Sequence, residues 1–237
     1  MSKDFVILGG GVSGLVCAYE LLKKGNKVSV FEAKDYLGGL ASTIKYKNFP
    51  IDYGPHVFHS AFPEIVNYWR DLVGNKLVKK DFFAGNYIEG NFYDYPINRE
   101  TMKYQYSSKE IDIIENDLKE LNIKKLGNCK NYSEYVKVLS GDFLSKKFFT
   151  KYPEKLWGLK TDNLSARFAP RRIEIREKRK PFHSGKGRFS GCIDGGCGEL
   201  SNSLKQKIFE LGGKLFNKYK ACEFLFSDQS NEKNDWY

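Results

Sequence analysis

The fold of this chain is decided by residues 5–14, which read FVILGGGVSG. The first four residues are apolar and predict a short strand. Three of the glycines that follow, Gly9, Gly11 and Gly14, have the spacing G-x-G-x-x-G. Apolar residues over 15–24 then recur at helical spacing. The stretch therefore predicts a strand, a tight turn and a helix.

A second strand is expected at residues 28–31, and it ends at the acidic residue Glu32. In such a strand–helix–strand unit the glycine turn lets a pyrophosphate approach the helix N-terminus, where backbone N–H groups are free. Glu32 would accept hydrogen bonds from a ribose diol and repel a 2′-phosphate. The alternative is a glycine-rich turn without a ligand. The agreement of strand, helix and acid favours a dinucleotide such as FAD or NAD.

The length of 237 residues is enough for one large domain or two small ones. The formal charge is +10, but most basic residues are spread along the chain. The one dense run, Arg176–Lys180, is interpreted as a solvated face, with attraction of an anionic ligand as the alternative. The sequence shows no nucleic-acid-binding signature, so the expected partner is an anionic small molecule.

The cysteines are odd in number, and no secretory signal peptide precedes them, which predicts reduced thiols and a cytoplasmic protein. They are Cys17, Cys129, Cys192, Cys197 and Cys222. Together with three widely spread histidines they make a poor metal site, so no metal is expected. No apolar run is long enough to span a membrane.

Further elements follow from apolar spacing and from capping residues. Ser107 and Glu110 have the spacing of a capping box at the start of a helix. Other helices are expected at 63–73, 133–139, 143–151 and after Gly195-Gly196, with β-like segments at 82–97 and 221–226.

The predicted fold class is α/β, with a Rossmann-like domain that binds a dinucleotide and an inserted, mainly helical and cationic substrate domain. The first part of the nucleotide-binding domain is expected at 1–106, the insertion at 107–188, the return at 189–226 and a frayed tail at 227–237.

The doublet Gly38-Gly39, followed by Thr43, extends the first motif. Over residues 4–43 the chain resembles an FAD-binding family that includes amine oxidases, protoporphyrinogen oxidases, phytoene desaturases and UDP-galactopyranose mutases. The resemblance implies FAD as the cofactor. The residues it implies for binding are Gly9, Gly11, Val12, Ser13, Gly14, Glu32, Ala33, Gly38, Gly39 and Leu40.

Three later segments resemble UDP-galactopyranose mutases: residues 54–59 (GPHVFH), 95–101 (YPINRET) and 152–158 (YPEKLWG). The resemblance implies that His56 and His59 lie beside the flavin as catalytic residues. It places Tyr152 and Trp157 in the substrate cleft and Arg171 or Arg172 on the diphosphate of a UDP-sugar. The alternatives are turn-closing histidines, core aromatics and a solvated basic pair.

The implied reaction is redox-neutral: reduced flavin displaces UDP from the sugar, whose ring opens and recloses as the furanose. Pro153, Leu156 and Phe189 depart from the mutase pattern, and the stretch 195–200 is equally similar to oxidases and desaturases. An FAD-dependent oxidoreductase is therefore the second functional hypothesis. Family members continue beyond the length of this chain, so a truncated, inactive fragment is the third. The sequence also leaves open whether the protein forms a homodimer.

Overall fold

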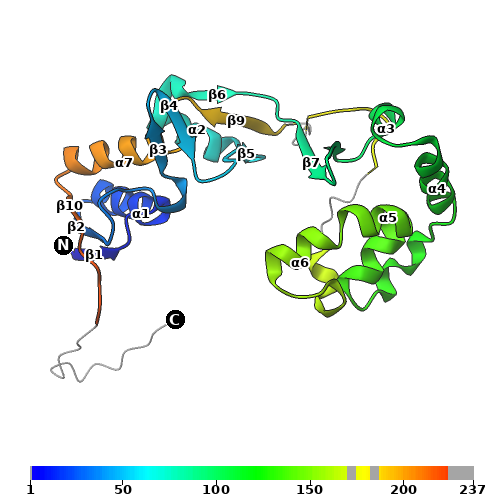
Figure 1. The fold of residues 1–237 in the computed structure, drawn as a ribbon. Helices are drawn as coiled ribbons and strands as arrows, with labels where there is room; N and C mark the ends of the chain where they lie inside the picture. The colour runs from blue at the N-terminus through cyan, green and yellow to red at the C-terminus, as the bar shows by residue number, and fades with distance from the viewer. Residues whose placement is uncertain (1, 170–174, 182–186, 224–237) are drawn as a thin grey trace. The chain divides into compact units, whose positions relative to one another are not determined.

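The structure is a computed structural model that describes residues 2–169, 175–181 and 187–223. The chain divides into two compact units (Figure 1). The first unit comprises residues 1–80 and 186–237, and the second comprises residues 81–185.

The first unit is built on a parallel sheet in the order β1 (Asp4–Leu8), β2 (Lys27–Glu32) and β10 (Lys214–Asn217). Helix α1 (Val12–Lys23) connects β1 to β2, and α7 (Gly198–Glu210) precedes β10. Both helices bury a stripe of residues spaced three or four apart. These residues are Leu15, Ala18, Leu22, Leu200, Leu204 and Ile208. The predicted Rossmann-like unit is confirmed.

Among the described residues, the rest of the first unit consists of short antiparallel elements and the helix α2. Strands β3 (Thr43–Tyr46) and β4 (Phe49–Asp52) form a hairpin. A second sheet has the order β5 (Phe58–Ser60), β9 (Phe189–Ile193) and β6 (Leu77–Lys79). Short 3-10 turns lie at Gly39–Ala41 and Gly74–Lys76, and α2 (Pro63–Val73) has its predicted bounds. Because β9 lies between β5 and β6, residues after 186 complete this unit.

The last strand lies earlier than the sequence pattern predicts. The strand expected at residues 221–226 is absent from 221–223, and residues 224–226 lie outside the described residues, as does the expected tail at 227–237. The reason is the tight return at Gly212 and Gly213. A Cβ on Gly213 would lie 2.6 Å from the Leu22 Cδ1 atom, so the chain passes close to α1 and meets β2 at once.

The second unit begins with a hairpin of β7 (Ala84–Ile88) and β8 (Asn91–Tyr95). In the described part of this unit, four α-helices follow: α3 (Arg99–Gln105), α4 (Ser108–Lys119), α5 (Tyr132–Phe148) and α6 (Lys151–Trp157). Short 3-10 helices lie at Ile123–Asn128, Thr161–Asn163 and Ala166–Phe168. The expected boundary at residue 107 falls inside this unit, because Tyr93 and Ile97 pack into the same core as Ile114 and Leu144.

Helix α5 contains a break where the sequence predicts a gap between two helices. Gly141 adopts φ 79°, and a Cβ there would lie 2.5 Å from the Asp117 Cβ atom of α4. The Asp117 Oδ2 atom accepts a hydrogen bond of 2.8 Å from the Phe143 backbone N–H, which restarts the helix. The glycine is therefore required by the close approach of α4.

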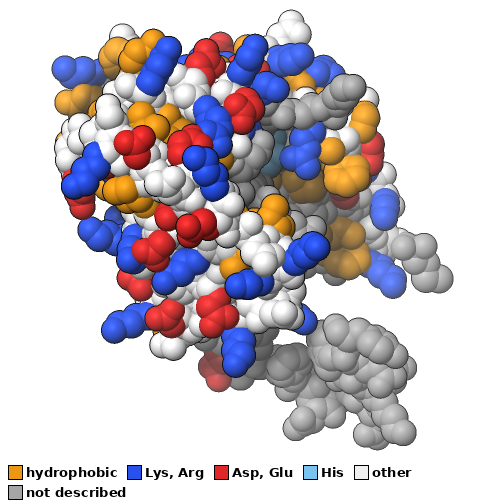
Figure 2. Space-filling model, turned by 90° about the vertical axis from the view of Figure 1, so that its right-hand side faces the viewer, with side chains coloured by type: hydrophobic (Ala, Val, Ile, Leu, Met, Phe, Trp, Pro, Cys, Tyr) orange, Lys and Arg blue, Asp and Glu red, His pale blue; other side chains and the backbone are white. Residues whose placement is uncertain are grey.

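The dense basic run is largely exposed, as the solvated-face interpretation predicts, but Arg179 within it is paired. The Arg179 Nε atom donates to Asp94 Oδ2 at 3.1 Å, and its backbone N–H donates to Glu100 Oε2 at 2.9 Å. Its guanidinium also lies 4.4 Å from the centre of the Phe83 ring. On the face shown in Figure 2, Lys and Arg side chains are spread among Asp and Glu side chains. Among the described residues, no helix combines the length and hydropathy that a membrane crossing requires.

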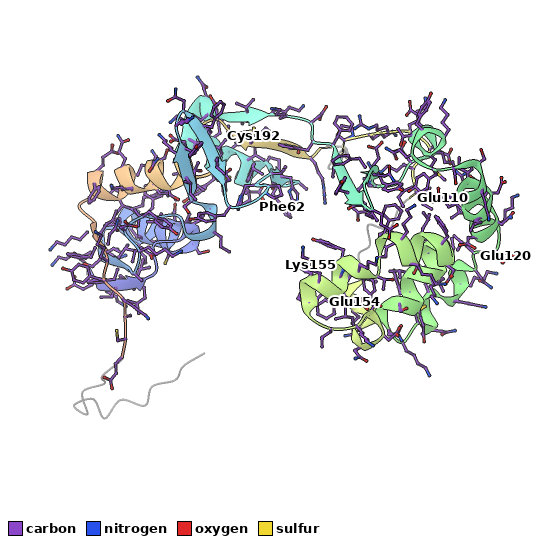
Figure 3. All side chains as sticks on the ribbon, in the orientation of Figure 1. Phe62, Glu110, Glu120, Glu154, Lys155 and Cys192 are labelled. Carbon is purple, nitrogen blue, oxygen red and sulfur yellow. The ribbon has the colours of Figure 1, made fainter. Side chains whose placement is uncertain are left out.

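The predicted capping box at α4 is present, and it also joins two helices. The Ser107 backbone N–H donates to Glu110 Oε2 at 2.9 Å, and the Lys147 ammonium of α5 donates to Glu110 Oε1 at 2.8 Å. These hydrogen bonds, the one from Lys147 being the larger effect, lower the pKa of Glu110 to about 2. Figure 3 labels Glu110 near the start of α4.

We predict that Glu110→Gln destabilises the second unit by about 1–2 kcal/mol at about pH 7. The folded-state pKa lies below the ordinary value, so the carboxylate stabilises the fold above that value. This stabilisation is lost as the pH falls toward about 2. Urea unfolding followed by circular dichroism measures the loss. Glu120→Gln, an exposed change at the other end of α4, is the control. An equal loss at about pH 7 and about pH 3 would contradict the assignment.

Candidate functional site

The first glycine turn has the geometry that its spacing predicts. Gly9 turns the chain out of β1 with φ +102°, and Gly11 precedes α1 as its N-cap. A Cβ on Gly14 would lie 2.1 Å from the Gly9 carbonyl oxygen, so only glycine permits this contact between helix and turn. A Cβ on Gly11 would meet nothing within 4 Å. The space above Gly11 is therefore open on the side where a phosphate would lie.

The peptide groups of Gly10 are hydrogen-bonded in two directions. Its N–H donates to Glu32 Oε2 at 2.7 Å, and its carbonyl oxygen accepts from the Gly38 N–H at 2.8 Å. A Cβ at this buried position would lie 2.5 Å from the Leu37 Cδ2 atom. The sequence interpretation assigned no role to Gly10, because the motif treats it as a variable position. The run of three glycines was the available signal.

The second glycine doublet lies directly against the first turn. Gly38 and Gly39 have φ values of +104° and +58°, and Gly38 forms a parallel bridge with Gly11. A Cβ on Gly39 would lie 3.4 Å from the Gly11 Cα atom. The two loops thus form one surface, which we call the glycine cradle, made of residues 9–14 and 38–40. Among its other predicted members, Ser13 and Leu40 are exposed and Val12 is half-buried.

The cradle fits the adenosine diphosphate half of FAD. The N–H groups of the first turn of α1 have no carbonyl partner within the helix, which leaves them available to a phosphate. The Glu32 carboxylate accepts from Gly10 and from the Lys34 N–H at 2.8 Å. A carboxylate has about four acceptor sites, so two remain for a ribose diol. Ala33, next to it, is exposed.

The hairpin β3–β4 holds the start of α7. The Asp52 carboxylate oxygens accept from the Cys197 N–H at 3.1 and 3.2 Å. The Thr43 hydroxyl donates to Asp52 and accepts from the Gly198 N–H at 2.7 Å. A Cβ on Gly38 would in turn lie 2.6 Å from the Ser201 Oγ atom of α7. The helix is therefore fixed against the second glycine loop. The sequence interpretation did not find this role of Asp52.

The two predicted catalytic histidines lie in different surroundings. His56 is half-buried in the loop before β5, and its Nδ1 atom lies 3.1 Å from the Gly54 carbonyl oxygen. It lines a cavity of about 200 Å³ together with Trp69 and Cys197. His59 is exposed on β5 and is not part of this lining. Burial and the Asp52 carboxylate raise the pKa of the Cys197 thiol to about 12.

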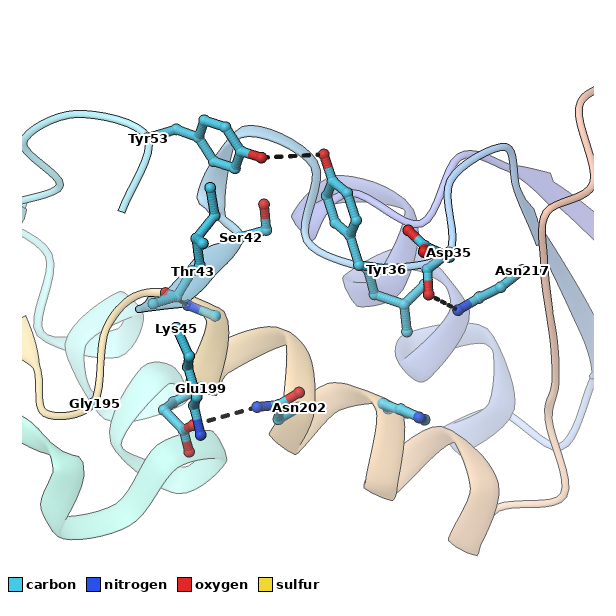
Figure 4. A pocket seen from close by; sticks show the side chains of 14 residues that line it. Asp35, Tyr36, Ser42, Thr43, Lys45, Tyr53, Gly195, Glu199, Asn202 and Asn217 are labelled. Carbon is cyan, nitrogen blue, oxygen red and sulfur yellow. Dashed lines mark hydrogen bonds between the residues drawn. The ribbon is translucent and has the colours of Figure 1, made fainter. Parts of the chain in front are cut away.

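A second hollow, of about 360 Å³, lies between the hairpin and α7 (Figure 4). The Tyr36 and Tyr53 hydroxyls approach to 3.4 Å at its rim, and the Asn202 amide donates to Glu199 Oε1 at 3.3 Å. Its lining carries both signs of charge: Lys45, Lys205, Asp35 and Glu199. It therefore lacks the net positive character that a diphosphate clamp requires.

The predicted substrate residues belong to the second unit. Tyr152 and Trp157 lie on α6, the helix that carries Glu154 and Lys155 in Figure 3, and they are 67% and 51% exposed. The Trp157 ring contacts the Phe168 ring edge-on at 5.2 Å. This exposure contradicts the alternative that they are core aromatics. Arg171 and Arg172 lie outside the described residues.

We predict that Gly11→Ala weakens nucleotide binding without destabilising the fold. The added Cβ contacts no protein atom but occupies the space that a pyrophosphate needs. Fluorescence titration with FAD should show an affinity at least about tenfold lower than that of the wild type, with the same melting temperature.

The matched control is Gly14→Ala in the same motif. Its Cβ would collide with the Gly9 carbonyl, so this variant should lower the melting temperature as well. Wild-type FAD affinity in Gly11→Ala would refute the cradle.

Comparison with known proteins agrees with a nucleotide-binding site at the glycine cradle. Residues 7–72 match the family model of the NAD(P)-binding Rossmann-like domain. The dTDP-fucopyranose mutase of Escherichia coli is 25% identical over 94% of this chain and 60% of its own length. The 1-hydroxycarotenoid 3,4-desaturase of a Flavobacterium species is 31% identical over 61% of this chain and 29% of its own length.

A solved structure of reduced UDP-galactopyranose mutase has the same fold, with a TM-score of 0.66 and 20% identity. The match covers 92% of this chain and 49% of that one. The chain thus spans about half of the solved structure and 60% of the E. coli relative. The glycine cradle and these comparisons agree: the chain has a Rossmann-like nucleotide-binding domain and is similar to FAD-dependent enzymes, among them UDP-galactopyranose mutases, protoporphyrinogen oxidases and carotenoid desaturases.

Proposed function

We propose that this protein acts as a nucleotide-sugar mutase, which interconverts the pyranose and furanose forms of a sugar bound to a nucleoside diphosphate. The observation that carries the proposal is a set of exposed apolar side chains on and just after α6 in the second unit. Tyr152, Leu156 and Trp157 lie on α6, Leu159 and Phe168 follow it, and each is at least half exposed. An exposed indole supported edge-on by another ring is suited to stack on a nucleobase.

The extent of the similarity supports a mutase over a desaturase. The match to dTDP-fucopyranose mutase covers 94% of this chain, so it includes the second unit. The match to the desaturase covers 61% of the chain, so it also extends into the second unit but leaves more of the chain unmatched than the mutase does. Segments that distinguish substrates in flavoenzymes are those outside the nucleotide-binding fold. The second unit is therefore the part whose resemblance bears on the reaction.

Each part of the chain has a distinct role in this proposal. The cradle binds the adenosine diphosphate of FAD, and the bound flavin supplies the bond-making chemistry at the sugar. Trp157 and Tyr152 position the nucleobase. The net charge of +10 attracts a substrate that carries a diphosphate. We further propose that Arg171 or Arg172 contacts this diphosphate and that His56 and His59 lie beside the flavin.

The second candidate is an FAD-dependent oxidoreductase. It is favoured by the cavity beside His56, whose walls include Phe58, Trp69, Ile193 and Leu200. Apolar walls suit a substrate that binds through carbon atoms, whereas a nucleotide sugar needs polar contacts. The two candidates differ in their products, because a mutase leaves the substrate at the same oxidation level.

The test incubates the full chain with FAD, reduces it with dithionite without oxygen and adds UDP-galactofuranose or a dTDP-linked furanose. We expect the pyranose isomer to form with reduced protein only, as measured by chromatography. An organic substrate that reduces the flavin without isomerisation would indicate the oxidoreductase. Protein that stays colourless after addition of FAD would indicate an inactive fragment. Failure to bind UDP and dTDP would contradict the mutase proposal.

We predict that Trp157→Ala weakens binding of UDP or dTDP by about 1–3 kcal/mol, the range for loss of one base–aromatic stack. Calorimetric titration measures the change. Tyr104→Ala is the control, because Tyr104 is a 78% exposed aromatic residue of the same unit that lies outside α6. Equal affinities of the Trp157→Ala variant and the control would exclude the stacking role.

A further inference from the structure

Three side chains with different donor atoms converge at the start of α7. Asp52 ends β4, His56 lies in the loop that follows it, and Cys197 is the N-cap residue of α7. Their ligand atoms, an oxygen, a nitrogen and a sulfur, all lie within 4.8 Å of one another. Each residue is half-buried, so the group is neither a solvated surface cluster nor sealed in the core.

The contact of His56 with the backbone fixes which ring nitrogen is available. Its Nδ1 atom lies 3.1 Å from the Gly54 carbonyl oxygen, which is an acceptor only. The hydrogen bond therefore requires the proton on Nδ1 and leaves the lone pair on Nε2. Histidines that bind metal ions use this arrangement, in which the second nitrogen donates to a carbonyl or carboxylate and orients the ring.

The other two groups contact each other: the Cys197 thiol hydrogen-bonds to the Asp52 carboxylate, and a bound cation would take the place of the thiol proton. The Asp52 carboxylate is oriented by the Cys197 backbone N–H and by the Thr43 hydroxyl. A carboxylate keeps further acceptor sites after these bonds. The same bonds use the backbone of Cys197, so its sulfur is not needed for the cap. The Cys197 sulfur and an Asp52 carboxylate oxygen therefore come from two elements, α7 and β4, which a hydrogen bond joins.

The surroundings leave room for a cation and for one additional ligand. His56 and Cys197 line the cavity of about 200 Å³, whose remaining described walls are mainly apolar and include no Lys or Arg. This lining therefore places no positive charge that would repel a bound cation. Three protein ligands with an open fourth position toward a cavity describe a zinc site that keeps one exchangeable position.

We propose that Asp52, His56 and Cys197 form a binding site for a divalent cation of the zinc class. The set of one sulfur, one nitrogen and one oxygen donor suits Zn²⁺ and its spectroscopic substitute Co²⁺. The sequence spacing predicts no metal site, because Asp52 and Cys197 are 145 residues apart and meet only through the fold. The site uses residues of the first unit alone, and it shares His56 with the place proposed for the flavin, so its test is carried out on the chain without added FAD.

The test uses the full chain, treated with a chelator, dialysed and titrated with Co²⁺ and then Zn²⁺. We expect one equivalent of Co²⁺ to bind with a thiolate-to-cobalt charge-transfer band and the visible bands of a four-coordinate ion. Zn²⁺ should displace it. Cys197→Ala keeps the backbone cap and should lose the charge-transfer band, with an affinity at least about tenfold lower.

The matched control is Cys192→Ala, since Cys192 lines the same cavity but is not one of the three ligands. It should keep both the band and the affinity. His56→Ala supplies a second variant in an irregular loop, in case Cys197→Ala does not fold, and circular dichroism reports folding of all variants. The proposal is overturned if the wild type shows no thiolate band. It is equally overturned if the band survives in folded Cys197→Ala or folded His56→Ala, or is lost in folded Cys192→Ala.

Discussion

The first unit depends on the hydrogen bonds made by the buried residue Gly10. Its N–H donates to Glu32, and its carbonyl accepts from Gly38, so the acid at the end of β2 and the second glycine loop are both fixed to the first turn. A side chain at this position would collide with Leu37. The two loops are therefore joined by the protein's own hydrogen bonds, and a nucleotide would not have to order them separately. Such preorganisation lowers the entropic cost of binding.

A second constraint joins the beginning of the chain to its later part. Asp52 and Thr43 cap α7, and α7 in turn lies against Gly38 through Ser201. The residues after 186 thus support the cradle. In the second unit Glu110 has a comparable role, since it caps α4 and holds Lys147 of α5. In both units one carboxylate joins elements that are distant in sequence.

The sequence predicts the parts of this structure that depend on local rules. The glycine spacing, the apolar stripes of α1 and α7 and the capping box at Ser107 each involve residues a few positions apart. It does not predict contacts set by tertiary packing. The role of Gly10 depends on Gly38 and Glu32, the break at Gly141 on Asp117, and the position of β10 on the passage of Gly213 beside Leu22. The cluster of Asp52, His56 and Cys197 has no local signal at all.

The central claim is that Gly10 and Glu32 preform a site for an adenosine diphosphate with a free ribose. Calorimetric titration of the wild-type chain with ADP and with 2′-phospho-ADP (adenosine 2′-phosphate 5′-diphosphate), which differ only in the 2′-phosphate, tests it most directly. Because the Glu32 carboxylate would repel the 2′-phosphate, we expect ADP to bind at least about tenfold more tightly. Equal affinity for the two ligands, or preference for the 2′-phosphorylated one, would contradict the account.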